Sequence, residues 1–133
     1  MLIFVYMRIG ELANRTGLTV GTIRYYESIK LIPKPKTSES GYRFYTKDYI
    51  SILNFIRVAK TSGFSLREIR LLFKLDKCTE VNKFVRKKLD EITYKIKVYE
   101  GIKVKLNKLL KTCPNSGRLG NCTILESFYK TKV

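Results

Sequence analysis

The sequence predicts a mainly α-helical fold: a helix–turn–helix with a small wing, one long helix, then a loop and a short last helix. Three observations predict it. Two short helical patterns flank Gly17, alternating aromatic residues follow Gly41, and the stretch from about Thr79 to Lys111 contains no proline.

The first two helices are expected at residues 8–15 and 20–28. Ile9, Leu12 and Ala13 recur at i, i+3 and i+4, which is one face of a helix. Gly17 breaks that pattern, and Thr19 is a good residue to cap the next helix. Two short helices joined by a tight turn containing glycine form a helix–turn–helix.

Residues 29–45 are expected to form the wing. Two of the three prolines and a Ser-Glu-Ser-Gly turn stop helix formation there. The aromatic residues that follow Gly41 indicate a short strand or hairpin.

Two further helices follow the wing. Thr46 and Asp48 are candidate caps for the first, which Gly63 ends. The second begins with Ser65 and Glu68, the Ser-x-x-Glu spacing of a capping box, and is expected to run to about Leu75.

One long helix is expected over about residues 79–111. Its apolar positions step by four and three residues from Val85 to Leu110, as in a coiled coil. At 1.5 Å per residue it spans roughly 50 Å, too long to bury its stripe on a domain of about 70 residues. We therefore favour a homodimer over a helix folded back at Gly101. Residues 112–122 are expected to form a loop, and residues 123–129 a final turn or two of helix.

Composition points to a polyanionic partner. The 133 residues carry 27 Lys and Arg against 11 Asp and Glu, a net charge of +16, which is typical of proteins that bind nucleic acid or an anionic membrane. A general lysine bias is the alternative explanation for part of this charge. The apolar start, MLIFVYM, is too short to span a membrane and lacks a signal-peptide cleavage site, so we expect a cytoplasmic protein. Residues 1–6 are interpreted as an upstream start that precedes Met7.

These motifs together resemble the MerR family of bacterial transcription regulators. The resemblance is carried by IGELANRTGLTVGTIRYYESIKLI, SGYRFYT and GFSLREIRLLF, and covers about residues 7–128. It implies a winged helix–turn–helix DNA-binding domain at 7–76, an antiparallel coiled-coil dimerisation helix at 77–111, and a metal-binding loop with a short helix at 112–133. It also implies binding to double-stranded promoter DNA together with RNA polymerase, and activation by untwisting a promoter whose spacer is too long.

Candidate DNA-binding residues lie in these motifs. A recognition helix needs exposed donors, and Arg24 can pair with the O6 and N7 atoms of guanine. Phosphate contacts need cations and hydroxyls. By resemblance, Arg24 and Tyr26 belong to the recognition helix. The resemblance also assigns Tyr42, Arg43 and Tyr45 to the wing, and Arg57 and Lys60 to a second wing. The full predicted set is Thr19, Thr22, Arg24, Tyr26, Tyr42, Arg43, Tyr45, Arg57 and Lys60. Tyr25 is also a candidate, and packing is the alternative role for one of the adjacent pair Tyr25 and Tyr26.

The three cysteines are candidate metal ligands. Cys78 precedes the long helix, while Cys113 and Cys122 bracket the loop that follows it. One straight helix separates Cys78 from Cys113 by about 50 Å, so one chain cannot use both on one ion. In an antiparallel dimer, Cys78 of one protomer meets Cys113 and Cys122 of its partner, which gives two identical sites.

The donor set indicates a thiophilic divalent ion. The chain has no His, and three thiolates suit Hg(II) or Pb(II), followed by Cd(II) and then Zn(II). The spacing resembles the mercury and lead sensors of the family; its copper and gold sensors have no Cys at the position of Cys78, and its zinc sensors add a His. Buried structural cysteines, and a redox switch through a Cys113–Cys122 disulfide, are the alternatives.

The predicted function is thus a metal-sensing transcription regulator that activates a metal-resistance promoter. A redox-responsive or other stress-responsive regulator of the same family is the alternative. An enzyme is disfavoured, because the chain has no His, no nucleophile with a base and no phosphate-cradling loop. A basic nucleoid-type protein would need neither loop cysteines nor a wing.

Overall fold

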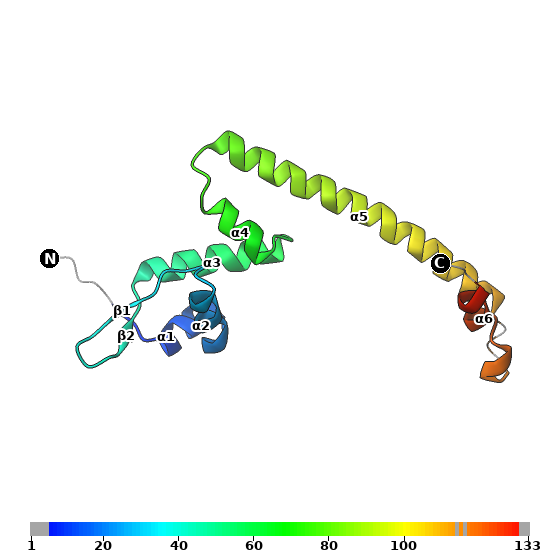
Figure 1. Cartoon of the computed structure of the whole chain (residues 1–133), viewed down its shortest axis with the longest axis horizontal. Coiled ribbons are helices and arrows are strands. Elements are labelled where there is room, and N and C mark those ends of the chain that lie inside the picture. The colour runs from blue at the N-terminus through cyan, green and yellow to red at the C-terminus, as the bar shows by residue number, and fades with distance from the viewer. Residues whose placement is uncertain (1–5, 114, 116, 131–133) are drawn as a thin grey trace. The chain divides into compact units, whose positions relative to one another are not determined.

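A computed structural model describes residues 6–113, 115 and 117–130 of the chain (Figure 1). The chain divides into two compact units, residues 1–82 and 83–133. The first holds helices α1 to α4 and a two-stranded sheet, and the second holds most of the long helix α5 and the C-terminal segment. The mainly helical fold with a small wing confirms the predicted fold class.

The helix–turn–helix consists of α1 (Ile9–Thr16) and α2 (Val20–Ser28). Gly17 caps α1 in the left-handed region, with φ 69°, where a residue without Cβ carries no steric penalty. The Thr19 hydroxyl accepts a hydrogen bond from the Thr22 amide at 3.1 Å and so caps α2. Both predicted helices and the predicted cap are confirmed.

The wing is an antiparallel hairpin of β1 (Lys36–Thr37) and β2 (Arg43–Phe44). Its turn is closed by the Gly41 amide, which donates to the Ser38 carbonyl at 2.9 Å. Next to β2, Met7 and Tyr45 exchange both backbone hydrogen bonds at 2.9 Å. The segment that precedes α1 is therefore part of this sheet from Met7 onward. Of the residues expected to lie outside the fold, Tyr6 packs its ring against Phe44, and residues 1–5 lie outside the described part of the chain.

Helices α3 (Lys47–Thr61) and α4 (Leu66–Leu72) follow the wing. Thr46 occupies the cap position of α3 without a side-chain capping bond, whereas Ser65 and Glu68 form the complete capping box predicted for α4. Helix α4 ends at Leu72, earlier than expected, because the amides of Lys74 and Leu75 bond to carbonyls only three residues back and tighten the last turn.

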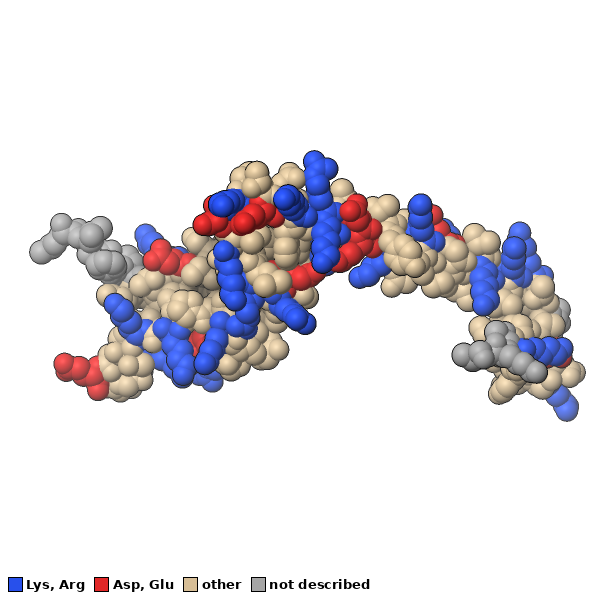
Figure 2. Space-filling view, turned by 45° about the horizontal axis from the view of Figure 1, so that its top comes forward, with Lys and Arg blue, Asp and Glu red and all other residues tan. Residues whose placement is uncertain are grey.

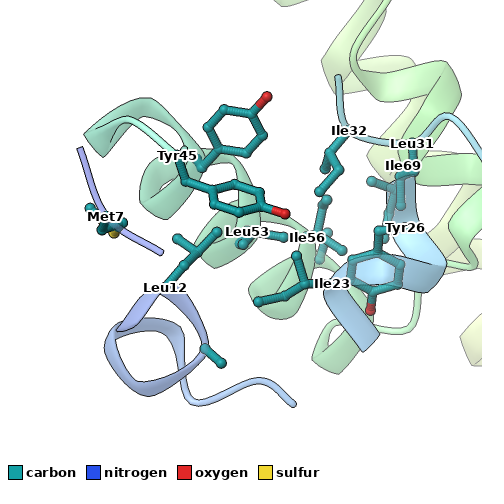
Figure 3. Close-up of a cluster of buried hydrophobic side chains, with 13 residues drawn as sticks. Met7, Leu12, Ile23, Tyr26, Leu31, Ile32, Tyr45, Leu53, Ile56 and Ile69 are labelled. Carbon is teal, nitrogen blue, oxygen red and sulfur yellow. The ribbon is translucent and has the colours of Figure 1, made fainter. Parts of the chain in front are cut away.

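A single hydrophobic core joins these elements (Figure 3). Leu12 of α1, Ile23 of α2, Leu53 and Ile56 of α3 and Ile69 of α4 are all 0% exposed. Side chains from four helices thus share one core, which fixes α2 against α1, α3 and α4.

Helix α5 (Cys78–Thr112) runs without interruption through Gly101, so the expected long helix is confirmed and the fold-back alternative is not. It is followed by a short 3₁₀ turn, η1 (Leu119–Asn121), and by α6 (Thr123–Lys130). Among the described residues, no helix is long and apolar enough to cross a membrane.

Candidate nucleic-acid interface and metal-binding loop

A positively charged hollow lies between α2 and the wing. It has a volume of about 730 Å³ and is lined by residues from the start of α1, from α2 and from the hairpin. Its cations are Arg8, Arg24, Lys34 and Arg43. Figure 2 shows Lys and Arg side chains gathered on the visible face of this unit. A concave surface lined by cations concentrates positive potential and attracts a polyanion.

Glu27 is the one acidic residue of this lining, and it is not available to repel a ligand. Its side chain is 6% exposed and both carboxylate oxygens accept hydrogen bonds. Arg43 of the wing donates to one oxygen at 2.9 Å, and the Tyr45 hydroxyl donates to the other at 2.5 Å. Glu27 therefore ties the recognition helix to the wing across 16 to 18 residues of sequence.

The hydroxyls around Glu27 stay protonated. Burial, and then the hydrogen bond to Glu27 and its negative charge, hold the pKa of Tyr45 well above its ordinary value. Burial and the charge of Glu27 also raise the pKa of Tyr49. Tyr45 is thus a permanent donor to Glu27 at neutral pH.

The wing presents its outer residues to the same hollow. Tyr42 is 54% exposed and its ring lies under the Arg8 guanidinium, 4.9 Å from carbon to ring centroid. This cation–π contact orients Arg8 beside the wing. Arg43 keeps a 54% exposed side chain although it is paired with Glu27.

The remaining predicted DNA-binding residues fall into three groups. Arg24 lies exposed in the hollow. Thr19 and Thr22 lie at the start of α2, where their hydroxyl oxygens are 2.8 Å apart. Arg57 and Lys60 are exposed on α3, outside the lining of the hollow.

Two tyrosines of the predicted set are corrected. Tyr26 is 3% exposed and Tyr45 is 0% exposed, so both side chains belong to the core and neither offers surface to a phosphate (Figure 3). The neighbouring Tyr25 is 53% exposed instead. Of the adjacent pair, the inward residue is the one that shares its stripe with Ile23.

Arg8, Lys34 and Glu27 were not in the predicted set. Glu27 follows Ile23 by four residues, and this spacing is the signal that places it on the inner face of α2. Arg8 precedes its helix and Lys34 lies between two prolines, so no periodic pattern in the sequence marks either residue.

The C-terminal unit holds a second hollow, between the end of α5 and the start of α6. It has a volume of about 240 Å³, and both Cys113 and Cys122 line it. The Thr123 hydroxyl donates to the Thr112 carbonyl at 3.1 Å and holds the two ends of the loop together. Both thiols are free and half-buried, so the loop brings two soft sulfur donors to one place.

Cys78 is exposed at the first position of α5. Helix α5 has 35 residues and separates Cys78 from Cys113 by about 50 Å. Within the described residues, no three side chains of His, Cys, Asp and Glu gather as a metal site. One chain therefore supplies two thiols in its loop and a third thiol that is far from them. The predicted site of three cysteines needs two chains, and it stays a prediction.

Comparison with known proteins gives matches along most of the chain. The family described as MerR HTH family regulatory protein matches residues 7–75, and the one described as MerR, DNA binding matches residues 50–109. A mercuric resistance operon regulatory protein of Bacillus cereus is 38% identical over 128 residues, which are 92% of this chain and 97% of that protein.

Two solved structures are also similar. The transcription regulator PbrR691 from Ralstonia metallidurans CH34, in complex with lead(II), is 34% identical with a TM-score of 0.83, over 92% of this chain and 98% of that chain. MerR from Bacillus megaterium MB1, in complex with mercury(II), is 34% identical with a TM-score of 0.71, over 93% of this chain and 100% of that chain.

Proposed function

This chain belongs to the MerR family of helix–turn–helix regulatory proteins, and on that basis we propose that it activates a metal-resistance promoter in response to a thiophilic divalent metal ion. Its relatives are transcription regulators, so the chain is a regulator and not an enzyme. The observation that carries the metal proposal is the pair of half-buried thiols, Cys113 and Cys122, in one hollow.

The N-terminal unit supplies the DNA-binding part of the function. Arg24 on the exposed face of α2 is suited to reading a guanine edge in the major groove. Arg8, Lys34, Tyr42 and Arg43 in the adjoining hollow are suited to phosphate contacts beside it. Thr19, Thr22, Arg57 and Lys60 extend this proposed contact surface, and RNA polymerase at the same promoter in the cytoplasm is the further proposed partner.

The metal site is proposed to form between two protomers. Cys113 and Cys122 of one chain bind the ion together with Cys78 of the other, because the length of α5 keeps Cys78 away from its own loop. An all-thiolate set without His favours Hg(II) or Pb(II), then Cd(II), then Zn(II). The similarity to a mercuric resistance regulator and to lead- and mercury-bound structures supports placing Hg(II) and Pb(II) first.

The ion acts by favouring one arrangement of the two DNA-binding units. Binding ties the loop of one protomer to the start of α5 of the other, and α5 is continuous with the end of the DNA-binding unit. An ion that bound both arrangements with equal affinity would not change their populations. The site must therefore bind the ion more tightly in the activating arrangement. Both metal-free and metal-bound forms are therefore expected to bind the operator, and only the metal-bound form distorts it.

Mixed dimers test the shared site. A Cys78→Ser chain is combined with a chain carrying Cys113→Ser and Cys122→Ser, and Hg(II) and Pb(II) are titrated against the thiolate absorption bands in the ultraviolet. Neither homodimer retains a complete site, whereas the heterodimer regains one from the loop of the first chain and Cys78 of the second. If the heterodimer binds the metal ion no more tightly than the homodimers do, the shared site is wrong. The metal site would then consist of the loop thiols alone.

The same titration ranks the metals and tests the redox alternative. Reduced wild-type protein is titrated with Hg(II), Pb(II), Cd(II) and Zn(II) and compared with protein oxidised beforehand. A metal sensor distorts promoter DNA only with the ion. A protein that distorts DNA on oxidation alone, through a Cys113–Cys122 disulfide, is a redox sensor.

A further inference from the structure

The Arg43 guanidinium is divided between the protein and the surface of the hollow. Its Nη1 atom donates to the Glu27 carboxylate at 2.9 Å. The Arg43 side chain is nevertheless 54% exposed, and a guanidinium carries five N–H donors in a planar fork. A phosphate oxygen can therefore accept the outward donors of Arg43 while the contact with Glu27 persists.

Glu27 is a fixed acceptor for this contact. It lies one helical turn after Ile23, which is completely buried, so the core holds this face of α2 in place. The Tyr45 hydroxyl donates to the second carboxylate oxygen and fixes the side chain from the other side. The position of the Arg43 guanidinium is thus set by α2, although Arg43 itself belongs to the wing.

The wing alone gives Arg43 little support. Its strands β1 and β2 have two residues each, and a hairpin that short is at best marginally stable by itself. A long arginine side chain without a partner occupies many rotamers. Without Glu27, DNA would have to order the guanidinium at the moment of binding, which costs affinity.

Arg24 precedes Glu27 by three residues on α2, and both line the hollow. One rigid helix therefore carries the residue proposed to read a base and the residue that holds the proposed phosphate contact. Phosphate contacts fix the position of a protein on the duplex, and base contacts then read the sequence. The pair of Glu27 and Arg43 keeps these two contacts at a constant spacing.

We propose that Glu27 is a positioning residue for DNA binding, whose carboxylate holds the Arg43 guanidinium where it meets a backbone phosphate. This inference rests on the proposed contact between Arg43 and DNA. Simple electrostatics predicts that removing an acidic residue from a surface that binds DNA strengthens binding. Loss of the Glu27 charge is expected to weaken binding instead, because Arg43 loses its position.

A neutral variant of Glu27 tests the sign of this effect. Glu27→Gln keeps the size of the side chain and removes its charge. Binding to a fluorescein-labelled duplex of arbitrary sequence, about 30 base pairs long, is followed by fluorescence anisotropy at about 100 mM salt. The Kd of Glu27→Gln is expected to be at least about 5-fold higher than that of wild type. A Kd equal to or below the wild-type value overturns the proposal.

Glu11→Gln is the matched control for net charge. Glu11 is exposed on α1, pairs with Arg15 at 2.7 Å and lies outside the lining of the hollow. This variant removes the same charge from the same unit without touching Arg43. Its Kd is expected to equal the wild-type value or to fall by less than about 3-fold. A rise like that of Glu27→Gln would show that the effect is not specific to Glu27 and would overturn the proposal.

A double-mutant cycle tests whether Glu27 acts through Arg43. Arg43→Gln is expected to raise the Kd about 10-fold, and adding Glu27→Gln should raise it no further. If Glu27→Gln weakens binding equally with and without Arg43, it acts through the fold and the proposal is overturned. If Arg43→Gln binds DNA as wild type does, the proposed phosphate contact of Arg43 is wrong, and the inference that rests on it is overturned as well.

Two further variants separate positioning from stability. Tyr45→Phe removes the other hydrogen bond to Glu27 and leaves Arg43 paired, so it should lower the free energy of unfolding but keep the Kd within about 2-fold of wild type. Weakening as large as that of Glu27→Gln would show that lost stability explains both, which overturns the proposal. Glu27→Asp replaces Glu27→Gln if the latter does not fold. It keeps the charge but shortens the reach to Arg43, so its Kd should rise at least about 5-fold, and a wild-type Kd overturns the proposal.

Discussion

At the scale of single residues, Glu27 organises the basic hollow between α2 and the wing. It is a buried carboxylate among cations, and its two oxygens hold Arg43 and Tyr45 of the wing region. An unpaired buried carboxylate would be costly, so these two donors are what allow Glu27 to lie there. The position of Arg43 in the hollow thus depends on a residue of the recognition helix.

Arg24 is expected to carry sequence discrimination. Arg24→Ala should cost about 1–3 kcal/mol on the specific site, because a bidentate pair with guanine is lost. Lys34→Ala, which removes a cation from the same hollow, should instead weaken binding to all sequences alike. Gel-shift titrations on specific and unrelated DNA separate the two effects, and wild-type discrimination by Arg24→Ala would remove Arg24 from the reading surface.

Tyr45 is expected to make stability fall at alkaline pH. Its pKa is raised in the folded state, so above its ordinary value near 10 the unfolded chain releases a proton that the folded chain keeps. The free energy of unfolding therefore decreases as pH rises through that value. Tyr45→Phe should cost about 1–3 kcal/mol at pH 8, and this difference from wild type should shrink toward pH 11. Urea unfolding across that range measures it; a constant difference would contradict the assignment.

Helix α4 supports the recognition helix at the scale of elements. The Arg70 guanidinium donates hydrogen bonds to the carbonyls of Ile29 and Lys30, where α2 ends. A cation at a helix C-terminus satisfies free carbonyls and interacts favourably with the helix dipole. α4 therefore holds the end of α2 directly as well as through the shared core.

Removing this contact should loosen the N-terminal unit. Arg70→Met is expected to lower the free energy of unfolding by about 1–2 kcal/mol, since charged hydrogen bonds to two carbonyls are lost. Arg67→Met, at an exposed position of the same helix, is the control and should change it by less than about 0.5 kcal/mol. Equal effects of the two substitutions in thermal or urea unfolding would show that the Arg70 contact contributes nothing.

The charge of the whole molecule governs its affinity for DNA. The net charge is +16, and four cations line the hollow of the N-terminal unit. If a dimer neutralises about eight phosphates, the logarithm of the binding constant should fall with the logarithm of the salt concentration, with a slope of about −7. Filter binding between 50 and 200 mM salt measures the slope, and a value near zero would show that the hollows do not face the backbone.

The assembly is also a property of the whole molecule. The exposed apolar residues along α5 predict an obligate dimer, with about twice the chain mass of 15.5 kDa in sedimentation equilibrium at micromolar concentration. A clean monomer at that concentration would contradict both the dimer and the shared metal site.

The sequence by itself determined the order of the helices, the wing, the capping box at Ser65 and the long helix after Cys78. These features follow from local spacing and local caps, which act within a few residues of each other. The same local patterns carried the family resemblance that the matches over residues 7–109 bear out.

Only the tertiary structure decided which side chains face the hollow. Tyr26 and Tyr45 turned inward, Tyr25 turned outward, and Arg8 and Lys34 joined the lining. These outcomes depend on how α2 packs against a hairpin some 16 to 18 residues further along the chain, through Glu27, Arg43 and Tyr45. Local periodicity cannot specify contacts at that separation, because they are set by which faces the core brings together.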